Sequence, residues 1–196
     1  MFPDAAHLPG STLQPKGNTM MKLAMGLLIS SLMLAGAWEI EKAPSVAQVV
    51  ALDECDPATF NAPTAAGPDF CKNVAVGAST TFSTLFADAA AGHPDPKWDF
   101  EPDSMNVKEG TIVSVVNSGG EPHTFTEVAK FGGGFIGPLN GGEAAAPECS
   151  AGFSSVAVAK TRILQGSQQQ FVGLSKGEHL FQCCIHPWMR MTVNVK

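Results

Sequence analysis

The chain has 196 residues, 15% of them charged, and a formal net charge of −6. The acidic balance and the lack of a basic cluster argue against nucleic acid as a partner. The length suits one domain of ordinary size, with or without a leader. Twenty glycines, 14 prolines and runs rich in Val, Thr and Phe favour short strands joined by turns over a helical bundle.

Residues 1–37 have the pattern of an export leader. Lys22 precedes an uncharged, mostly apolar run, residues 23–35, which is too short to span a membrane comfortably. The triplet Ala35-Gly36-Ala37 then has the small-x-small form of a cleavage site. Losing this segment would change the net charge from −6 to −7, because it contains Asp4, Lys16 and Lys22. We therefore expect a periplasmic or secreted protein.

The start of the leader leaves alternatives open. Residues 1–19 are polar and contain Pro and Gly, which is unusual ahead of an export signal. Met20 or Met21 could be the true start, with residues 1–19 a mis-assigned extension. A longer N-terminal segment, cleaved after Ala47 or never cleaved, is the competing interpretation, and only an uncleaved segment would anchor the protein to a membrane.

The chain has five cysteines. In an oxidising compartment four of them can form disulfides, and one is left over. Cys55 and Cys71 bracket a Pro/Ala/Gly-rich stretch, and a disulfide there would stabilise it by roughly 3 kcal/mol. If Cys183 is the cysteine left over, three pairings of the other four remain. We favour Cys55 with Cys71 and Cys149 with Cys184.

Residues 38–93 are expected to form an N-terminal arm ahead of the main domain. Residues 49–73 show little hydrophobic periodicity and predict an irregular, disulfide-stapled segment. Residues 79–91 place Phe82, Leu85, Phe86, Ala89 and Ala90 at helical spacing, which predicts a short amphipathic helix ending before Gly92.

Residues 94–196 are expected to form the main domain, built from short strands. The segments with strand patterns are residues 97–100, 105–108, 111–116, 123–128, 156–159, 161–164, 168–172, 179–183 and 191–195. A Gly/Ala/Pro-rich loop, residues 131–152, separates two groups of them and is unusually long for a compact domain. Turns between short strands with almost no helix predict an all-β fold, an antiparallel sandwich or barrel.

Three side chains suited to copper lie in one short loop before the last strand. Cys183, His186 and Met189 stand at i, i+3 and i+6, and His123 offers a distant second imidazole. Thiolate and thioether suit Cu(I), and imidazole suits both oxidation states, so this set can hold copper through a redox cycle. Pro187 stiffens the loop directly after His186. The spacing predicts a mononuclear copper site.

Two neighbours of these residues leave the ligand set open. Met191 is a rival axial ligand to Met189. Cys184 adjoins Cys183, but adjacent strand residues point to opposite faces, so only one of the two can face the metal.

The same residues resemble those of the cupredoxins, a family of blue-copper proteins. The run Cys183-Cys-Ile-His-Pro-Trp-Met-Arg190 is similar to the ligand loop of amicyanin, and residues 117–123 resemble the approach to the first histidine in plastocyanin-type members. The resemblance covers residues 94–196. It implies a Greek-key β-sandwich that binds one type 1 copper ion, and its ligands are implied to be His123, Cys183, His186 and Met189.

The function that we expect is one-electron transfer by cycling Cu(II) and Cu(I). Four protein ligands leave no open position for a substrate, so we do not expect an enzyme. A redox partner would dock near His186 and Trp188, and the acidic charge of this monomer would favour a basic partner surface. Two alternatives remain: copper sequestration or delivery, and a copper-free sandwich that binds a partner and has Cys183 in a disulfide.

Overall fold

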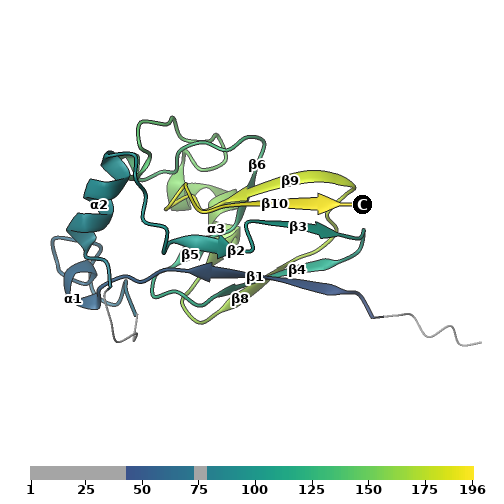
Figure 1. Cartoon of the computed structure of the whole chain (residues 1–196), viewed down its shortest axis with the longest axis horizontal. Helices are drawn as coiled ribbons and strands as arrows, with labels where there is room; N and C mark the ends of the chain where they lie inside the picture. The colour runs from purple at the N-terminus through teal and green to yellow at the C-terminus, as the bar shows by residue number, and fades with distance from the viewer. Residues whose placement is uncertain (1–42, 73–78) are drawn as a thin grey trace, which may run out of the picture. The chain divides into compact units, whose positions relative to one another are not determined.

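A computed structural model describes residues 43–72 and 79–196 of the chain, and two four-stranded sheets form its framework (Figure 1). The first sheet has the strand order β2-β1-β4-β8, the second has β3-β10-β9-β6, and β5 pairs with β7. The strands are β1 (Val46–Leu52), β2 (Asp99–Glu101), β3 (Ser104–Val107), β4 (Ile112–Asn117), β5 (His123–Thr124), β6 (Thr126–Val128), β7 (Arg162–Ile163), β8 (Gln168–Phe171), β9 (Gly177–Gln182) and β10 (Arg190–Val195). The all-β prediction is confirmed.

The helical elements are short. They are α1 (Pro57–Phe60), α2 (Phe82–Ala90), α3 (Val156–Lys160) and the 3-10 turns η1 (Gly137–Leu139) and η2 (Gly152–Ser154). No helix in the described ranges is both long and apolar enough to cross a membrane. The expected leader, residues 1–37, lies outside the described residues.

The core lies between the two sheets and is rich in aromatic side chains. The Phe125 ring stacks on Phe181 of β9 at 4.3 Å between centroids, and it lies 5.1 Å from Phe100 of β2 and 5.1 Å from Phe171 of β8. Strand β10 alternates in burial, with Met191, Val193 and Val195 facing inward. Each fully buried side chain of this size contributes about 1.5–3 kcal/mol, so these contacts hold the two sheets together.

Both sheets are mixed, which corrects the expectation of an antiparallel sandwich. β1 runs parallel to β4, and β3 runs parallel to β10, while the remaining pairs are antiparallel. Parallel neighbours cannot be joined by a tight hairpin, so the chain crosses between the sheets to form them.

The prediction of an irregular segment at residues 49–73 is wrong at its start. Strand β1 lies between β2 and β4 and pairs with both of them. Val49 and Ala51 are fully buried, so this short apolar run became a strand because the sheet pairs it on both sides. The rest fits the expectation of a stapled arm, since the Cys55–Cys71 disulfide is present and α1 is only one turn long.

Helix α2 confirms the predicted amphipathic helix. The Thr81 hydroxyl caps it by accepting a hydrogen bond from the Thr84 N–H, and Leu85 and Ala89 are buried. Gly92 follows the helix with a positive φ of 75°, a conformation that favours glycine. Helices α1 and α2 lie together at one end of the sheets (Figure 1).

The strand expected at residues 156–159 is instead helix α3. Val156 and Val158 imitate the two-residue period of a strand, but Val156 is exposed and Val158 is fully buried. Only one face of this segment packs, against a small cluster around Cys149, and the alanines between the valines favour a helix. The other predicted strands coincide with observed ones to within two or three residues.

Candidate metal centre

Three of the four predicted ligands meet at the end of the sheets that carries α1 and α2. His123 begins β5, Cys183 directly follows β9, and His186 lies in the loop from β9 to β10. Cys183 Sγ lies 3.8 Å from His123 Nδ1 and 3.9 Å from His186 Nδ1, and all three donor atoms lie within 4.8 Å of one another. The three side chains are buried. This grouping joins residues 60 positions apart into one compact donor set.

The loop before His123 is held by the buried side chain of Asn117. Its amide group donates to the carbonyl oxygens of Glu121 at 2.7 Å and Ile163 at 3.0 Å, and its oxygen accepts from the Gly119 N–H at 2.9 Å. Gly119 has no room for a side chain, because an added Cβ would lie 1.9 Å from Asp53 Oδ2. The turn is therefore fixed in the shape that delivers His123.

The Cys183 sulfur is buried next to two backbone hydrogen-bond donors. The backbone N–H groups of Thr124 and His186 each approach it at 3.5 Å. The Thr124 hydroxyl accepts a 2.7 Å hydrogen bond from the Cys184 N–H, which ties the two ligand-bearing segments together. Such donors stabilise charge on the sulfur, and in a copper site they tune its electronics.

Cys184 points away from this donor set and forms a disulfide with Cys149. Both pairings favoured from the sequence are therefore present, and Cys183 is the cysteine left free in the described chain. The disulfide fastens the long loop of residues 131–152 to the segment that carries Cys183.

Met189 lies in the same loop and is fully buried. The Cys183 N–H donates to the Met189 carbonyl at 3.0 Å, and the Met189 N–H donates to the His186 carbonyl at 3.0 Å. These bonds close the loop tightly around the three positions. Met191, the rival, lies within β10 opposite Phe181 and faces the core. Met189 as the axial ligand stays a prediction.

Two buried carboxylates contact the outer nitrogens of the two histidines. Asp53, directly after β1, lies 2.8 Å from His123 Nε2 through Oδ2. Glu121 Oε2 lies 3.1 Å from His186 Nε2, at ion-pair distance but outside hydrogen-bond geometry. All four side chains are at most 2% exposed. Each imidazole thus faces the thiol with Nδ1 and a carboxylate with Nε2.

The contacts around Asp53 and His123 shift their pKa values. Burial raises the pKa of Asp53, but His123 and the backbone N–H groups of Glu121 and Cys55 outweigh it and hold that pKa below its ordinary value. Burial lowers the pKa of His123, whereas Asp53 and Cys183 raise it more, to about 10. The carboxylate thus keeps this imidazole protonated when no metal is present.

The pKa values of His186 and Cys183 are also set by burial acting against nearby charges. Burial lowers the pKa of His186, but the charge of Glu121 and the sulfur of Cys183 raise it to about 9. Burial raises the pKa of the Cys183 thiol, yet His123 and His186 hold it well below its ordinary value. Without metal, these shifts favour a thiolate beside two imidazolium groups.

Aromatic side chains enclose His186. The centroid of its ring lies 6.1 Å from that of Trp98 and 5.6 Å from that of Trp188. An apolar cavity of about 270 Å³ separates it from the helices, with Phe60, Leu85 and Glu121 among its lining residues. The His186 side chain is buried beneath these residues.

Comparisons with known proteins find structural likenesses at low identity and low TM-score. No family model matches the sequence, and no curated protein matches it either. Among solved structures, the chain is similar to a purple cupredoxin from Nitrosopumilus maritimus (15% identity, 76% of this chain and 99% of that one, TM-score 0.36). It is also similar to plastocyanin from Dryopteris crassirhizoma (17%, 76% and 100%, 0.37) and to a reduced amicyanin variant (20%, 52% and 77%, 0.34).

The fold is cupredoxin-like. At these TM-scores the neighbours carry no weight for the chemistry, which rests on the residues of this chain. The two sheets and the ligand loop between β9 and β10 define the architecture.

The sequence reasoning did not find Asp53 or Glu121. Asp53 lies in the segment taken as irregular, although an acidic residue at the end of an apolar run is a weak sign of a strand end beside a site. Glu121 lies two residues before His123, and no spacing rule marks it. A second acidic cluster, Asp53 with Glu121 and Cys55, suits a metal less well because the Cys55 sulfur is in a disulfide.

Proposed function

We propose that this protein binds one copper ion in a type 1 site and carries one electron at a time by cycling Cu(II) and Cu(I). The ligands are His123, Cys183, His186 and Met189. The observation that carries the proposal is the compact triangle formed by the buried Cys183 sulfur and two imidazole Nδ1 atoms, which lie 3.8 and 3.9 Å from the sulfur. A thiolate with two imidazoles is the donor set of copper electron-transfer sites.

The chemistry of the donors fits the metal. When bound, copper supplies the one-electron couple; the protein supplies fixed ligands, a dry surrounding and donors to the sulfur. Thr124 and His186 point backbone N–H groups at that sulfur, and the hydrogen bonds of Met189 hold the loop closed. A ligand set that scarcely moves keeps the cost of reorganisation low during electron transfer, and a site without an open position supports a carrier rather than an enzyme.

Burial separates this proposal from the two alternatives. Copper delivery needs ligands that an acceptor protein can reach, whereas His123, Cys183 and His186 are at most 1% exposed. A copper-free binding module has no use for a free thiol between two imidazoles. The two disulfides also support an oxidising compartment, so we propose a periplasmic or secreted location.

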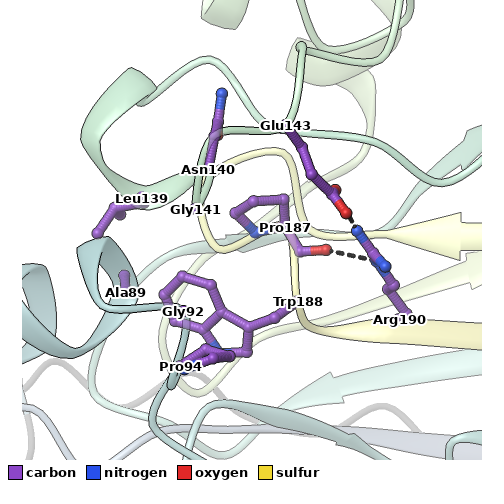
Figure 2. A pocket seen from close by; sticks show the side chains of 10 residues that line it. All are labelled: Ala89, Gly92, Pro94, Leu139, Asn140, Gly141, Glu143, Pro187, Trp188 and Arg190. Atoms are coloured by element: carbon purple, nitrogen blue, oxygen red, sulfur yellow. Dashed lines mark hydrogen bonds and ion pairs between the residues drawn. The ribbon is translucent and has the colours of Figure 1, made fainter.

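Trp188 provides a route by which electrons could reach a partner. A surface pocket of about 240 Å³ lies over Trp188 and Pro187, with Leu139, Asn140 and Arg190 among its other lining residues (Figure 2). Arg190 is held there by Glu143 at 2.6 Å and by the Pro187 carbonyl at 2.9 Å. We propose that a redox protein with a basic surface docks here, because the chain is acidic overall and Trp188 contacts the His186 ring.

The proposal is tested by visible and EPR spectra after Cu(II) is added to the purified protein. An intense thiolate-to-copper band that disappears in Cys183→Ser supports it. The matched control is the double variant Cys149→Ala/Cys184→Ala, which should keep the band because that pair faces away from the donors. Absence of the band in the unaltered protein, or its loss only in the control, would overturn the assignment.

The docking route has its own test. Trp188→Leu should slow electron exchange with a protein partner while the reduction potential and the spectrum stay unchanged. A changed spectrum with an unchanged exchange rate would mean instead that Trp188 only shields the site.

A further inference from the structure

The buried carboxylate of Glu121 lies beside the outer ring nitrogen of His186, the second histidine of this site. Glu121 lies at 3.1 Å from His186 Nε2, and its side chain is 1% exposed. Apart from that imidazole, neither of its oxygens has a hydrogen-bond donor among the described residues, so the His186 ring is the group that compensates its charge. Burying a carboxylate that has a single ionic partner costs folding free energy. Such a group needs an explanation, and an electrostatic effect on its partner provides one.

Asp53 differs from Glu121 in how its charge is distributed. Its oxygens accept from the backbone N–H groups of Cys55 at 3.2 Å, Gly120 at 2.9 Å and Glu121 at 2.9 Å, besides the contact with His123. Four partners share this charge, and three of them, Gly120, Glu121 and His123, belong to the loop that carries His123. Asp53 therefore serves mainly to position the loop, whereas the charge of Glu121 is left free to act on the site.

We infer that Glu121 is a positioning residue that lowers the reduction potential of the copper centre by acting through His186. The inference rests on the proposed function. Thiolate, Asp53 and Glu121 together carry three negative charges against the two of Cu(II) or the one of Cu(I), and the described cations lie outside this buried group. An uncompensated buried charge favours the oxidised ion, because Coulomb interactions strengthen where water is excluded.

Glu121→Gln tests this cleanly, because glutamine keeps the length and an acceptor oxygen but loses the charge. The ratio of Cu(II) to Cu(I) affinity should fall about tenfold or more, which raises the potential by about 59 mV or more for one electron. Glu121→Met removes the acceptor as well and should raise the potential at least as much. The matched control is Glu127→Gln, which removes an exposed carboxylate 2.6 Å from His179, outside the donor set, and should leave the potential unchanged.

The readouts are the potential from spectroelectrochemistry and the visible band that reports an intact site. A band with an unchanged potential in both Glu121 variants would overturn the inference and leave the proposed function standing. A potential that rises equally in Glu127→Gln would overturn it too, because the effect would then be one of overall charge. Absence of the band in the unaltered protein would instead refute the proposed function.

Discussion

Copper binding should release about two protons at pH 8, because both ligand histidines hold a proton in the metal-free protein. The pKa of His123 is raised to about 10 and that of His186 to about 9, while the pKa of Cys183 is held well below its ordinary value. A metal must displace one proton from each imidazole and none from the sulfur. Groups with ordinary pKa values would release only about one proton at this pH, nearly all of it from the thiol.

The sign of the pH dependence follows from the same shifts. The apparent copper affinity should rise with pH by about two log units per pH unit from near pH 7 to pH 8.5, and level off above the histidine pKa of about 10. The raised histidine pKa values stabilise the metal-free fold below the ordinary value of about 6.5, and this stability is lost as the pH rises toward 9 to 10. The lowered thiol pKa acts in the opposite direction but involves one proton instead of two, so the net stability falls.

Titration calorimetry with Cu(II) at pH 8, in two buffers of different ionisation enthalpy, measures the protons released directly. Denaturant midpoints of the metal-free protein at pH 6.5 and pH 9 measure the stability change. Release of one proton, or stability that rises between those two pH values, would show that the histidines are neutral in the folded metal-free protein and would refute the reasoning.

Three further predictions concern the supports of the site. The double variant Cys149→Ala/Cys184→Ala should lose about 4 kcal/mol of unfolding free energy for a bridge that spans 35 residues, measured by denaturant titration; a loss below about 1 kcal/mol would contradict the loop-closure estimate. Gly119→Ala should destabilise the fold by about 1–3 kcal/mol or more and shift the copper band, because its Cβ would displace Asp53; an unchanged band and midpoint would contradict that packing. A fragment of residues 94–196 should not fold, because it lacks β1 from the middle of the first sheet; a cooperative unfolding transition in that fragment would refute this.

The parts that the sequence could predict are those set by neighbours in the chain. Cys183, His186 and Met189 share one short loop, so their chemistry and spacing can be read together. Helix α2 has its cap, its apolar face and its terminating Gly92 within a dozen residues. The separation of Cys183 from Cys184 likewise followed from the alternation of adjacent side chains, and the disulfide of Cys184 agrees with it.

The parts that it could not predict depend on partners far along the chain. Strand β1 is an ordinary apolar run until β2 and β4, about 50 to 70 residues later, pair with its two edges. Helix α3 is the opposite example: its sequence alternates as a strand does, but it forms a helix. Only Val158 is buried there, so no second apolar position stabilises a strand. Short segments of this kind are decided by tertiary contacts rather than by local preference.

The region before residue 94 shows how distant contacts complete a site that a local motif predicts. The resemblance to cupredoxins began at residue 94, which made everything before it look like an appendage. Yet β1 completes the first sheet, and its end places Asp53 against His123, 70 residues away. Helix α1 contributes Phe60 to the cover over His186. The ligand loop supplies the predicted donors, and the region before residue 94 supplies a carboxylate and a cover. The ligand motif alone therefore predicts a metal, but it cannot predict the charges around the site that would set its reduction potential.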